Sequence, residues 1–244
     1  MNSIGIIPAR YASTRFPGKP LVNIGGKTMI RRVYEQVQQS RLKEVLVATD
    51  DDRILAEVQS FGGKAVMTGS QHQSGTDRCF EAYCTYDVPT DCIINIQGDE
   101  PFIQPEQINQ VLDCFENPLT QIATLIKTVA TTEELFNPNT PKVVIDNQEQ
   151  AIYFSRHPIP YFRGADQENW LGQQRYYKHI GIYGYRADIL EQITRLSPSQ
   201  LEIAESLEQL RWLENGFKIK TALTTYDNFG IDTPADLEKA LSNL

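Results

Sequence analysis

Three cationic side chains follow the first apolar run of the chain within ten residues. Arg10, Arg15 and Lys19 lie in the segment PARYASTRFPGKPL, directly after the apolar residues 3–8. Gly18 and the nearby Ser and Thr residues permit a tight backbone path, so backbone N–H groups can also face an anion. If residues 3–8 form a strand of a parallel sheet, this loop lies at the carboxyl end of the strand, where open α/β sheets bind ligands. The pattern predicts a site for a phosphate-rich ligand.

The same loop excludes two common kinds of phosphate site. It is neither a Walker A sequence nor GxGxxG, so P-loop hydrolysis and dinucleotide binding are disfavoured. An exposed surface loop with scattered charges is the alternative interpretation.

The whole chain carries 23 Lys and Arg against 31 Asp and Glu, a formal net charge of -8. Such a chain lacks the broad basic surface that sequence-independent nucleic-acid binding requires, so we expect no nucleic-acid partner.

Two aspartates far apart in the sequence are candidate ligands for a divalent cation. Asp99 ends the apolar segment CIINIQGD, and Asp232 lies in GIDTP. Mg²⁺ is commonly held by one or two carboxylates, with phosphates and water completing its shell. From the sequence alone, capping of a helix that begins near Pro234 explains Asp232 equally well.

The first half of the chain alternates between strand and helix signals. The expected strands are apolar throughout, which is typical of a parallel sheet covered on both faces. They are residues 3–8, 45–49, 64–67 and 92–97. Helical spacing of apolar residues predicts helices at 29–39, from Asp50 or Asp51 to Phe61, at 76–85 and at 105–115. This order predicts an α/β fold with a doubly wound, mostly parallel sheet.

The second half is less regular. Strands are expected at 121–128, 142–145, 151–155, 179–185 and 218–224, and helices at 188–196, at 199–215 and from 234 onward. Residues 163–174 are polar and rich in turn formers, so we expect an exposed loop there. With no low-complexity linker, residues 1–244 are expected to form a single domain from which an antiparallel excursion at about 128–185 projects. Its aromatic residues must pack on the core or on another subunit.

Composition defines the broad class. The chain has 244 residues, of which 41% are hydrophobic and 22% charged, an ordinary globular balance. Four cysteines without a CxxC pair fit reduced thiols better than disulfides or a zinc site. The first residues resemble no signal peptide, and no apolar run approaches the length of a membrane span. We expect a soluble, cytoplasmic protein without a membrane partner.

The segment IIPARYASTRFPGKPL resembles the signature of sugar-nucleotide cytidylyltransferases, and of their sugar-acid branch in particular. Seven further blocks are similar to the enzymes that make CMP-Kdo from 3-deoxy-D-manno-octulosonate (Kdo). They are QSGTDR, NIQGDEP, FNPN, YFSR, HIGIYGY, LEQLR and GIDTP. The eight blocks occur in the right order from about residue 4 to about residue 241.

The resemblance implies transfer of a cytidylyl group from CTP to Kdo with Mg²⁺, for lipopolysaccharide synthesis, in a homodimer formed through the excursion. It assigns catalysis to Arg10, Lys19 and Asp99, and the metal to Asp99 and Asp232. It implies nucleotide binding by Ala9, Arg10, Arg15, Lys19, Ser74, Gly75 and Gln97. It implies sugar binding by Arg78, Gln97, Arg156, His179, Tyr183, Glu208 and Gln209.

Simpler interpretations remain open at several of these positions. Ser74 to Thr76 can form an anion-binding helix start, or only a capped helix. Glu208 and Gln209 lie on an expected helix whose apolar stripe is core, so a solvated face is the ordinary expectation for them. A single His beside a strand, such as His179, is usually structural. At the level of function, two alternatives remain: activation of another sugar acid such as a sialic acid, and a non-catalytic nucleotide-binding relative.

Overall fold

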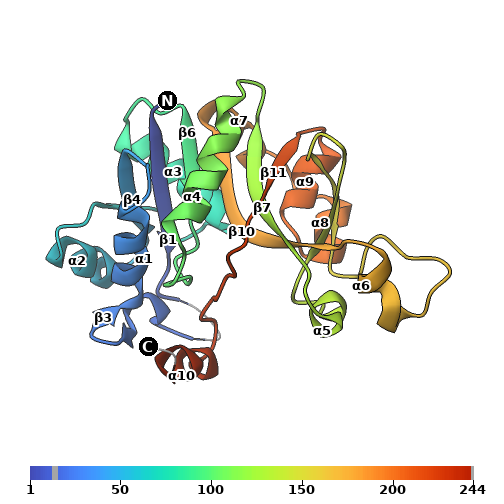
Figure 1. Ribbon diagram of the computed structural model, residues 1–244. Helices are drawn as coiled ribbons and strands as arrows, with labels where there is room; N and C mark the ends of the chain where they lie inside the picture. The colour runs from blue at the N-terminus through green and yellow to red at the C-terminus, as the bar shows by residue number, and fades with distance from the viewer. Residues whose placement is uncertain (13–15, 243–244) are drawn as a thin grey trace.

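The apolar runs of the first half form four parallel strands (Figure 1). The computed structural model describes residues 1–12 and 16–242. Strand β1 (Ser3–Ala9) pairs with β4 (Glu44–Thr49) on one side and with β6 (Cys92–Asn95) on the other, and β5 (Ala65–Met67) extends the sheet beyond β4. All four strands therefore present their carboxyl ends at the same edge of the sheet.

The second half completes this sheet with a mixture of directions. Strand β10 (Tyr177–Arg186) lies antiparallel between β6 and β7 (Ile122–Thr128), and β11 (Ile219–Leu223) runs parallel to β7. A hairpin of β8 (Lys142–Ile145) and β9 (Ala151–Ser155) pairs with the first residues of β10. The strand order β11-β7-β10-β6-β1-β4-β5 confirms the predicted doubly wound, mostly parallel sheet.

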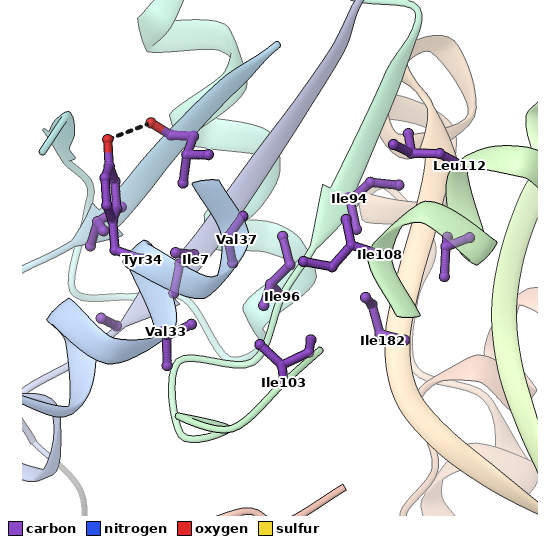
Figure 2. Close-up of a cluster of buried hydrophobic side chains, with 14 of the residues drawn as sticks. Ile7, Val33, Tyr34, Val37, Ile94, Ile96, Ile103, Ile108, Leu112 and Ile182 are labelled. Atoms are coloured by element: carbon purple, nitrogen blue, oxygen red, sulfur yellow. Dashed lines mark hydrogen bonds between the residues drawn. The ribbon is translucent and has the colours of Figure 1, made fainter. Parts of the chain in front are cut away.

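Helices cover both faces of the sheet. One face is covered by α1 (Met29–Gln38), α2 (Asp52–Ser60) and α4 (Pro105–Asp113), and the other by α3 (Gly75–Tyr86), α7 (Ala187–Thr194) and α9 (Gln209–Glu214). Figure 2 shows part of the first face, where side chains of α1 and α4 meet those of β1 and β6. Because both faces are filled with apolar side chains, polar groups that bind a ligand are left at the ends of the strands.

The remaining elements are short. They are the hairpin strands β2 (Asn23–Ile24) and β3 (Lys27–Thr28), the helices α5 (Thr132–Phe136), α6 (Trp170–Gln173), α8 (Gln200–Glu205) and α10 (Pro234–Ser242), and three 3₁₀ turns at Lys19–Leu21, Cys114–Glu116 and Gln167–Asn169. No helix among the residues described is both long and apolar enough to span a membrane.

The expectation of an exposed loop at 163–174 is confirmed for most of its residues but is wrong at Trp170. This stretch contains a 3₁₀ turn and α6, and its Trp170 is only 1% exposed. The indole packs against Phe136 and Tyr176 and donates its Nε1–H to the carbonyl of Ala165 at 3.1 Å. The polar residues around Trp170 hid its burial in the sequence, although Tyr176 is only six positions away; the other partner, Phe136, comes from α5. The segment thus contributes to a small apolar cluster that is separate from those on the two faces of the sheet.

The single helix expected at 199–215 is also wrong. Helix α8 ends at Ser206, which adopts the left-handed conformation (φ 51°), and α9 starts again at Gln209. The predicted core stripe is broken as a result: Leu210 is buried, but Ile203 is 68% exposed. The carbonyls of Glu205 and Ser206 that the break releases accept hydrogen bonds from the Arg156 guanidinium.

Candidate active site

A cleft of about 260 Å³ lies at the carboxyl ends of β1 and β6, beside the start of α3. It brings together nine of the predicted site residues, from five separate parts of the chain. They are Ala9, Arg10, Lys19, Ser74, Gly75, Arg78, Gln97, Asp99 and Asp232. Arg15, predicted to bind nucleotide, falls outside the described residues.

Two glycines let the backbone form this cleft. A Cβ on Gly98 would lie 2.7 Å from the carbonyl oxygen of Pro8, so only glycine allows the turn after β6 to approach the end of β1. Gly18 has φ 71° and donates its N–H to the carbonyl of Tyr11 at 3.0 Å, which folds the basic loop back before Lys19. Both glycines therefore bring the cationic loop close to Asp99.

Lys19 joins the two predicted metal ligands. Its Nζ lies 2.7 Å from Oδ2 of Asp99 and 2.9 Å from Oδ1 of Asp232, although 133 positions separate the two aspartates in the sequence. The Lys19 side chain is 13% exposed and the carboxylates are more open, at 29% and 44%. The two carboxylates thus converge on one point, which a cation occupies.

Helix capping does not account for Asp232. The N-terminus of α10 is capped by Thr233, whose Oγ1 accepts from the Asp236 N–H at 3.3 Å, while the Asp236 carboxylate accepts from the Thr233 N–H at 2.9 Å. This reciprocal pair is a capping box, with Asp236 in the position that Glu or Gln usually holds. The Asp232 side chain instead faces Lys19. The capping alternative is therefore wrong for Asp232 and right for Thr233.

The cleft offers positive charge to an anion. The Arg10 side chain is exposed at the rim and, in the parts of the chain that the structure describes, forms no ion pair. The start of α3 lies opposite: the Ser74 Oγ accepts from the Asp77 N–H at 3.1 Å, as expected for an N-cap. Because helix N-termini carry partial positive charge, this end of α3 favours an anion in the cleft.

Arg78 is fixed by the protein itself. It is 4% exposed, donates to Oγ1 of Thr68 at 2.6 Å and pairs with Asp50 at 2.9 Å. The guanidinium of Arg78 thus already has a carboxylate partner within the chain. The remaining surface of Arg78 lines the cleft.

His72, which is not among the predicted site residues, also lines the cleft. Its Nε2 contacts the carboxylate of Glu81, which also accepts from the N–H of Gly69 at 3.0 Å. The hydrogen bond from His72 holds the pKa of Glu81 below its usual range. His72 lies in the segment QHQSGTDR, which contains other predicted site residues, so its position could have marked it as a site residue. Its contact with Glu81 on α3 could not be read from the sequence.

Glu100, next to Asp99, does not line the cleft. Its carboxyl is buried, and burial together with the neighbouring Asp99 raises its pKa to about 8. A hydrogen bond from Asn228 at 3.0 Å partly opposes this shift.

Four of the predicted sugar-binding residues form a polar group behind the start of α3. Glu208 accepts from Oγ1 of Thr76 at 2.9 Å, and burial raises its pKa, so the expectation of a solvated face is wrong there. The rings of His179 and Tyr183 lie 5.2 Å apart on β10. Within the described residues, the Tyr183 hydroxyl and the Gln209 Nε2 are buried and have no hydrogen-bond partner. These two groups need a polar partner that the described chain does not supply.

Arg156, the fifth, lies after β9. Its guanidinium donates to the carbonyl oxygens of Glu205, Pro138 and Ser206 at 2.6, 3.0 and 3.1 Å. Carbonyl oxygens carry no net charge, so these bonds orient the positive charge of Arg156 without neutralising it.

The environment of His179 predicts a pH-dependent stability. The ring packs against Phe154, and burial lowers its pKa to about 3, so the folded protein keeps it neutral where the unfolded chain binds a proton. The free energy of unfolding should therefore fall as the pH drops from about 6.5 toward 3. If His179 were fully buried, the free energy of unfolding would change by about 1.4 kcal/mol per pH unit in this range. The partial exposure of His179 makes the change smaller.

Between pH 7 and pH 5, the wild type should therefore lose about 1 kcal/mol more stability than His179→Gln, as measured by urea unfolding. His157→Gln is the matched control, because His157 is exposed. Equal losses in the wild type and His179→Gln would contradict a depressed pKa.

The donors around Lys19 fit a hard divalent cation. Both are carboxylates, which Mg²⁺ prefers, and they already converge on one cationic group. Among the described residues, no group of three or more His, Cys, Asp or Glu is arranged to hold a metal. A cation at Asp99 and Asp232 would complete its shell with oxygens of a bound phosphate and water.

Comparison with known proteins identifies the family. Residues 4–219 match the family model described as cytidylyltransferase. The 3-deoxy-manno-octulosonate cytidylyltransferase of Parabacteroides distasonis is 58% identical, with 100% of this chain and 98% of the relative covered. That of Cytophaga hutchinsonii is 62% identical over 97% and 95%.

A solved structure of CMP:2-keto-3-deoxy-manno-octonic acid synthetase complexed with CTP superposes with a TM-score of 0.92 at 45% identity, covering 100% of this chain and 98% of the other. Solved structures that share only the fold with this chain are 14–19% identical to it, far below the 58% and 62% identity of the two relatives above. The chain belongs to the cytidylyltransferase family, in the branch of the 3-deoxy-manno-octulosonate cytidylyltransferases.

Proposed function

We propose that this protein transfers the cytidylyl group of CTP to Kdo, which gives CMP-Kdo and pyrophosphate. The observation that carries the proposal is the convergence of Lys19, Asp99 and Asp232 in one cleft that also contains Arg10 and the start of α3. A metal-bound triphosphate requires cationic side chains for its phosphates, here Arg10 and Lys19, and carboxylates for its metal, here Asp99 and Asp232. The identity of the nucleotide as CTP and of the sugar acid as Kdo comes from membership of the 3-deoxy-manno-octulosonate cytidylyltransferase branch.

The nucleotide side of the cleft is assigned to Ala9, Arg10, Arg15, Lys19, Ser74, Gly75 and Gln97. Arg10 and Lys19 would neutralise phosphate oxygens, and the N-terminus of α3 adds backbone dipoles of the same sign. Ser74 itself is engaged as the N-cap, so its hydroxyl already accepts a hydrogen bond from the backbone. Its contribution to a ligand is therefore the position of the helix start.

Asp99 and Asp232 are assigned as the protein ligands of Mg²⁺. When bound, the ion would screen the negative charge of the triphosphate and stabilise the charge that develops on the phosphate oxygens. The flexible Lys19 side chain would then contact a phosphate oxygen in place of the two carboxylates. This exchange of partners makes Lys19 the link between nucleotide and metal ligands.

The chemical step is an in-line substitution. The anomeric hydroxyl oxygen of Kdo forms a bond to the α-phosphorus, and the bond from the α-phosphorus to the bridging oxygen of the β-phosphate breaks. Its electron pair leaves with pyrophosphate, and the hydroxyl proton passes to solvent. The side chains contribute positioning and electrostatic stabilisation of the leaving phosphates, and no covalent enzyme intermediate is required.

Kdo is assigned to Arg78 and Gln97, which line the cleft, to Arg156 after β9, and to the polar group behind the start of α3, which consists of His179, Tyr183, Glu208 and Gln209. The buried Tyr183 hydroxyl and Gln209 amide, which lack partners in the described chain, match a ligand with many hydroxyls. The Arg156 guanidinium, which forms no ion pair among the described residues, matches the carboxylate of Kdo.

The experiment that tests the function measures pyrophosphate release over a matrix of nucleoside triphosphates and sugar acids, with and without Mg²⁺. We expect turnover with CTP and Kdo when Mg²⁺ is present. Faster turnover with N-acetylneuraminate would indicate activation of a sialic acid instead. Binding of CTP without turnover of any sugar acid would indicate a non-catalytic relative.

A homodimer is part of the proposal. Two large apolar side chains of the excursion at about 128–185, Ile152 and Tyr161, are 60% and 72% exposed. Exposed apolar side chains on a projecting segment fit a contact surface between subunits. Sedimentation of a monomer at micromolar concentration would contradict the dimer.

A further inference from the structure

Asp232 reaches the cleft at the end of a connecting segment, residues 224–233, that contains no helix or strand. The segment starts at β11, at one end of the strand order, and leads to α10 (Figure 1). Lys19, which Asp232 contacts, follows β1 in the middle of the sheet. Without regular hydrogen bonds of its own, the segment needs attachments to other elements to hold Asp232 in place.

Asn228 makes the central attachment. Its Nδ2 donates to Oε1 of Glu100 at 3.0 Å, and its Oδ1 accepts from Nε2 of Gln107 at 3.1 Å. Both partners are buried, Glu100 at 9% and Gln107 at 1% exposure. The other residues from 225 to 230 are exposed, so Asn228 is the least exposed residue of this stretch.

Both partners of Asn228 belong to the structure that carries Asp99. Glu100 directly follows Asp99 in a turn closed by the bond from the Ile103 N–H to the Glu100 carbonyl at 3.2 Å. Gln107 is in the first turn of α4, and its Oε1 accepts from the Gln104 N–H at 3.1 Å, so its amide is held at both ends. Asn228 therefore ties the segment to a rigid part of the Asp99 turn.

Other attachments flank Asn228: the Phe229 ring packs on Phe102 with 6.2 Å between ring centroids, and the Ile231 side chain is fully buried. Asp227 pairs with Lys127 at 2.6 Å and with Lys178 at 3.0 Å, but its side chain is 67% exposed, and exposed ion pairs stabilise little. The N–H of Ile231 donates to the carbonyl of Asp99 at 2.9 Å, next to Asp232 itself. The side-chain bonds of Asn228 thus support this backbone contact on the side that faces the sheet.

We propose that Asn228 is a positioning residue: it fastens the connecting segment to the turn that carries Asp99 and so sets the distance between the Asp99 and Asp232 carboxylates. The proposal rests on the proposed roles of these two aspartates. Removal of the Asn228 amide leaves the buried Glu100 and Gln107 groups without this partner, and the segment can then separate from the turn.

Asn228→Ala tests the proposal with two readouts. In the metal-free protein, hydrogen–deuterium exchange of the Ile231 amide should accelerate about tenfold, because the segment opens more often. The kcat with CTP and Kdo should fall about tenfold while KM for Kdo stays within twofold, since only the alignment of Asp232 changes. Asn215→Ala is the matched control, because that exposed amide caps α9 far from the cleft residues. Should Asn228→Ala fail to fold, Asn228→Ser retains one donor and should give smaller shifts in the same directions.

Unchanged exchange at Ile231 would overturn the proposal, and so would faster exchange with an unchanged kcat. A loss confined to KM for Kdo would also overturn it, because that result would indicate a sugar contact. The proposed function fails separately: if the wild type turns over no sugar acid, the exchange comparison still decides whether Asn228 fastens the segment.

Discussion

Replacement of Lys19 by alanine is expected to lower kcat at saturating CTP by about 10²–10³, the usual effect of removing one preorganised donor to a developing charge. Lys19 lies between Asp99 and Asp232, with its Nζ 2.7 and 2.9 Å from their oxygens. Its loss removes a cation from the leaving phosphates and leaves two carboxylates facing each other. The measurement is the initial rate of pyrophosphate release, with CTP and Kdo each raised until the rate no longer changes.

Lys27→Ala is the control for Lys19→Ala. Lys27 lies a few residues further along the chain, is 44% exposed and pairs with Glu35 outside the cleft. An unchanged kcat in Lys19→Ala, with only KM for CTP raised, would remove Lys19 from the transition state. Because Lys19 and Asp232 are in contact, the double variant Lys19→Ala/Asp232→Asn should lose less than the product of the two single losses.

Replacement of Asp232 by asparagine is expected to lower activity on the order of a hundredfold at the Mg²⁺ concentration that saturates the wild type, with partial recovery as Mg²⁺ is raised. The substitution keeps the size of the side chain and removes one of two anionic ligands, so the ion binds more weakly. The measurement is the Mg²⁺ concentration at half-maximal rate, which should rise several-fold or more.

Asp236→Asn removes the same charge four residues away and is the control for Asp232→Asn. The Asp236 carboxylate caps α10 and accepts from the backbone N–H groups of Thr233 and Asp232 at 2.9 and 3.2 Å, and asparagine keeps an oxygen that can accept both bonds. Its rate and Mg²⁺ dependence should stay within twofold of the wild type. If Asp232→Asn has the same Mg²⁺ dependence as the wild type, Asp232 is not a metal ligand.

Prediction from the sequence succeeded where the signal is local. Apolar runs and helical spacing predicted β1, α1, β4 and α2 to within a few residues, because these elements are buried on the sides that the pattern marks. Prediction failed at Trp170 and at Ser206. Phe136, which packs on Trp170, comes from another segment, and the left-handed residue Ser206 divides a continuous helical pattern.

The sequence by itself determined the fold class, the cationic loop and the family, since each depends on residue types at fixed spacing. It also supplied the candidate aspartates, but it left Asp232 undecided between a cap and a metal ligand. Only the tertiary structure separated these roles, because capping by Thr233 and Asp236 and the contact with Lys19 are visible only when distant segments meet. The same holds for Asn228, whose partners Glu100 and Gln107 are more than 120 positions away. Contacts over such separations leave no periodic trace in a single sequence, so they become evident only in the folded chain.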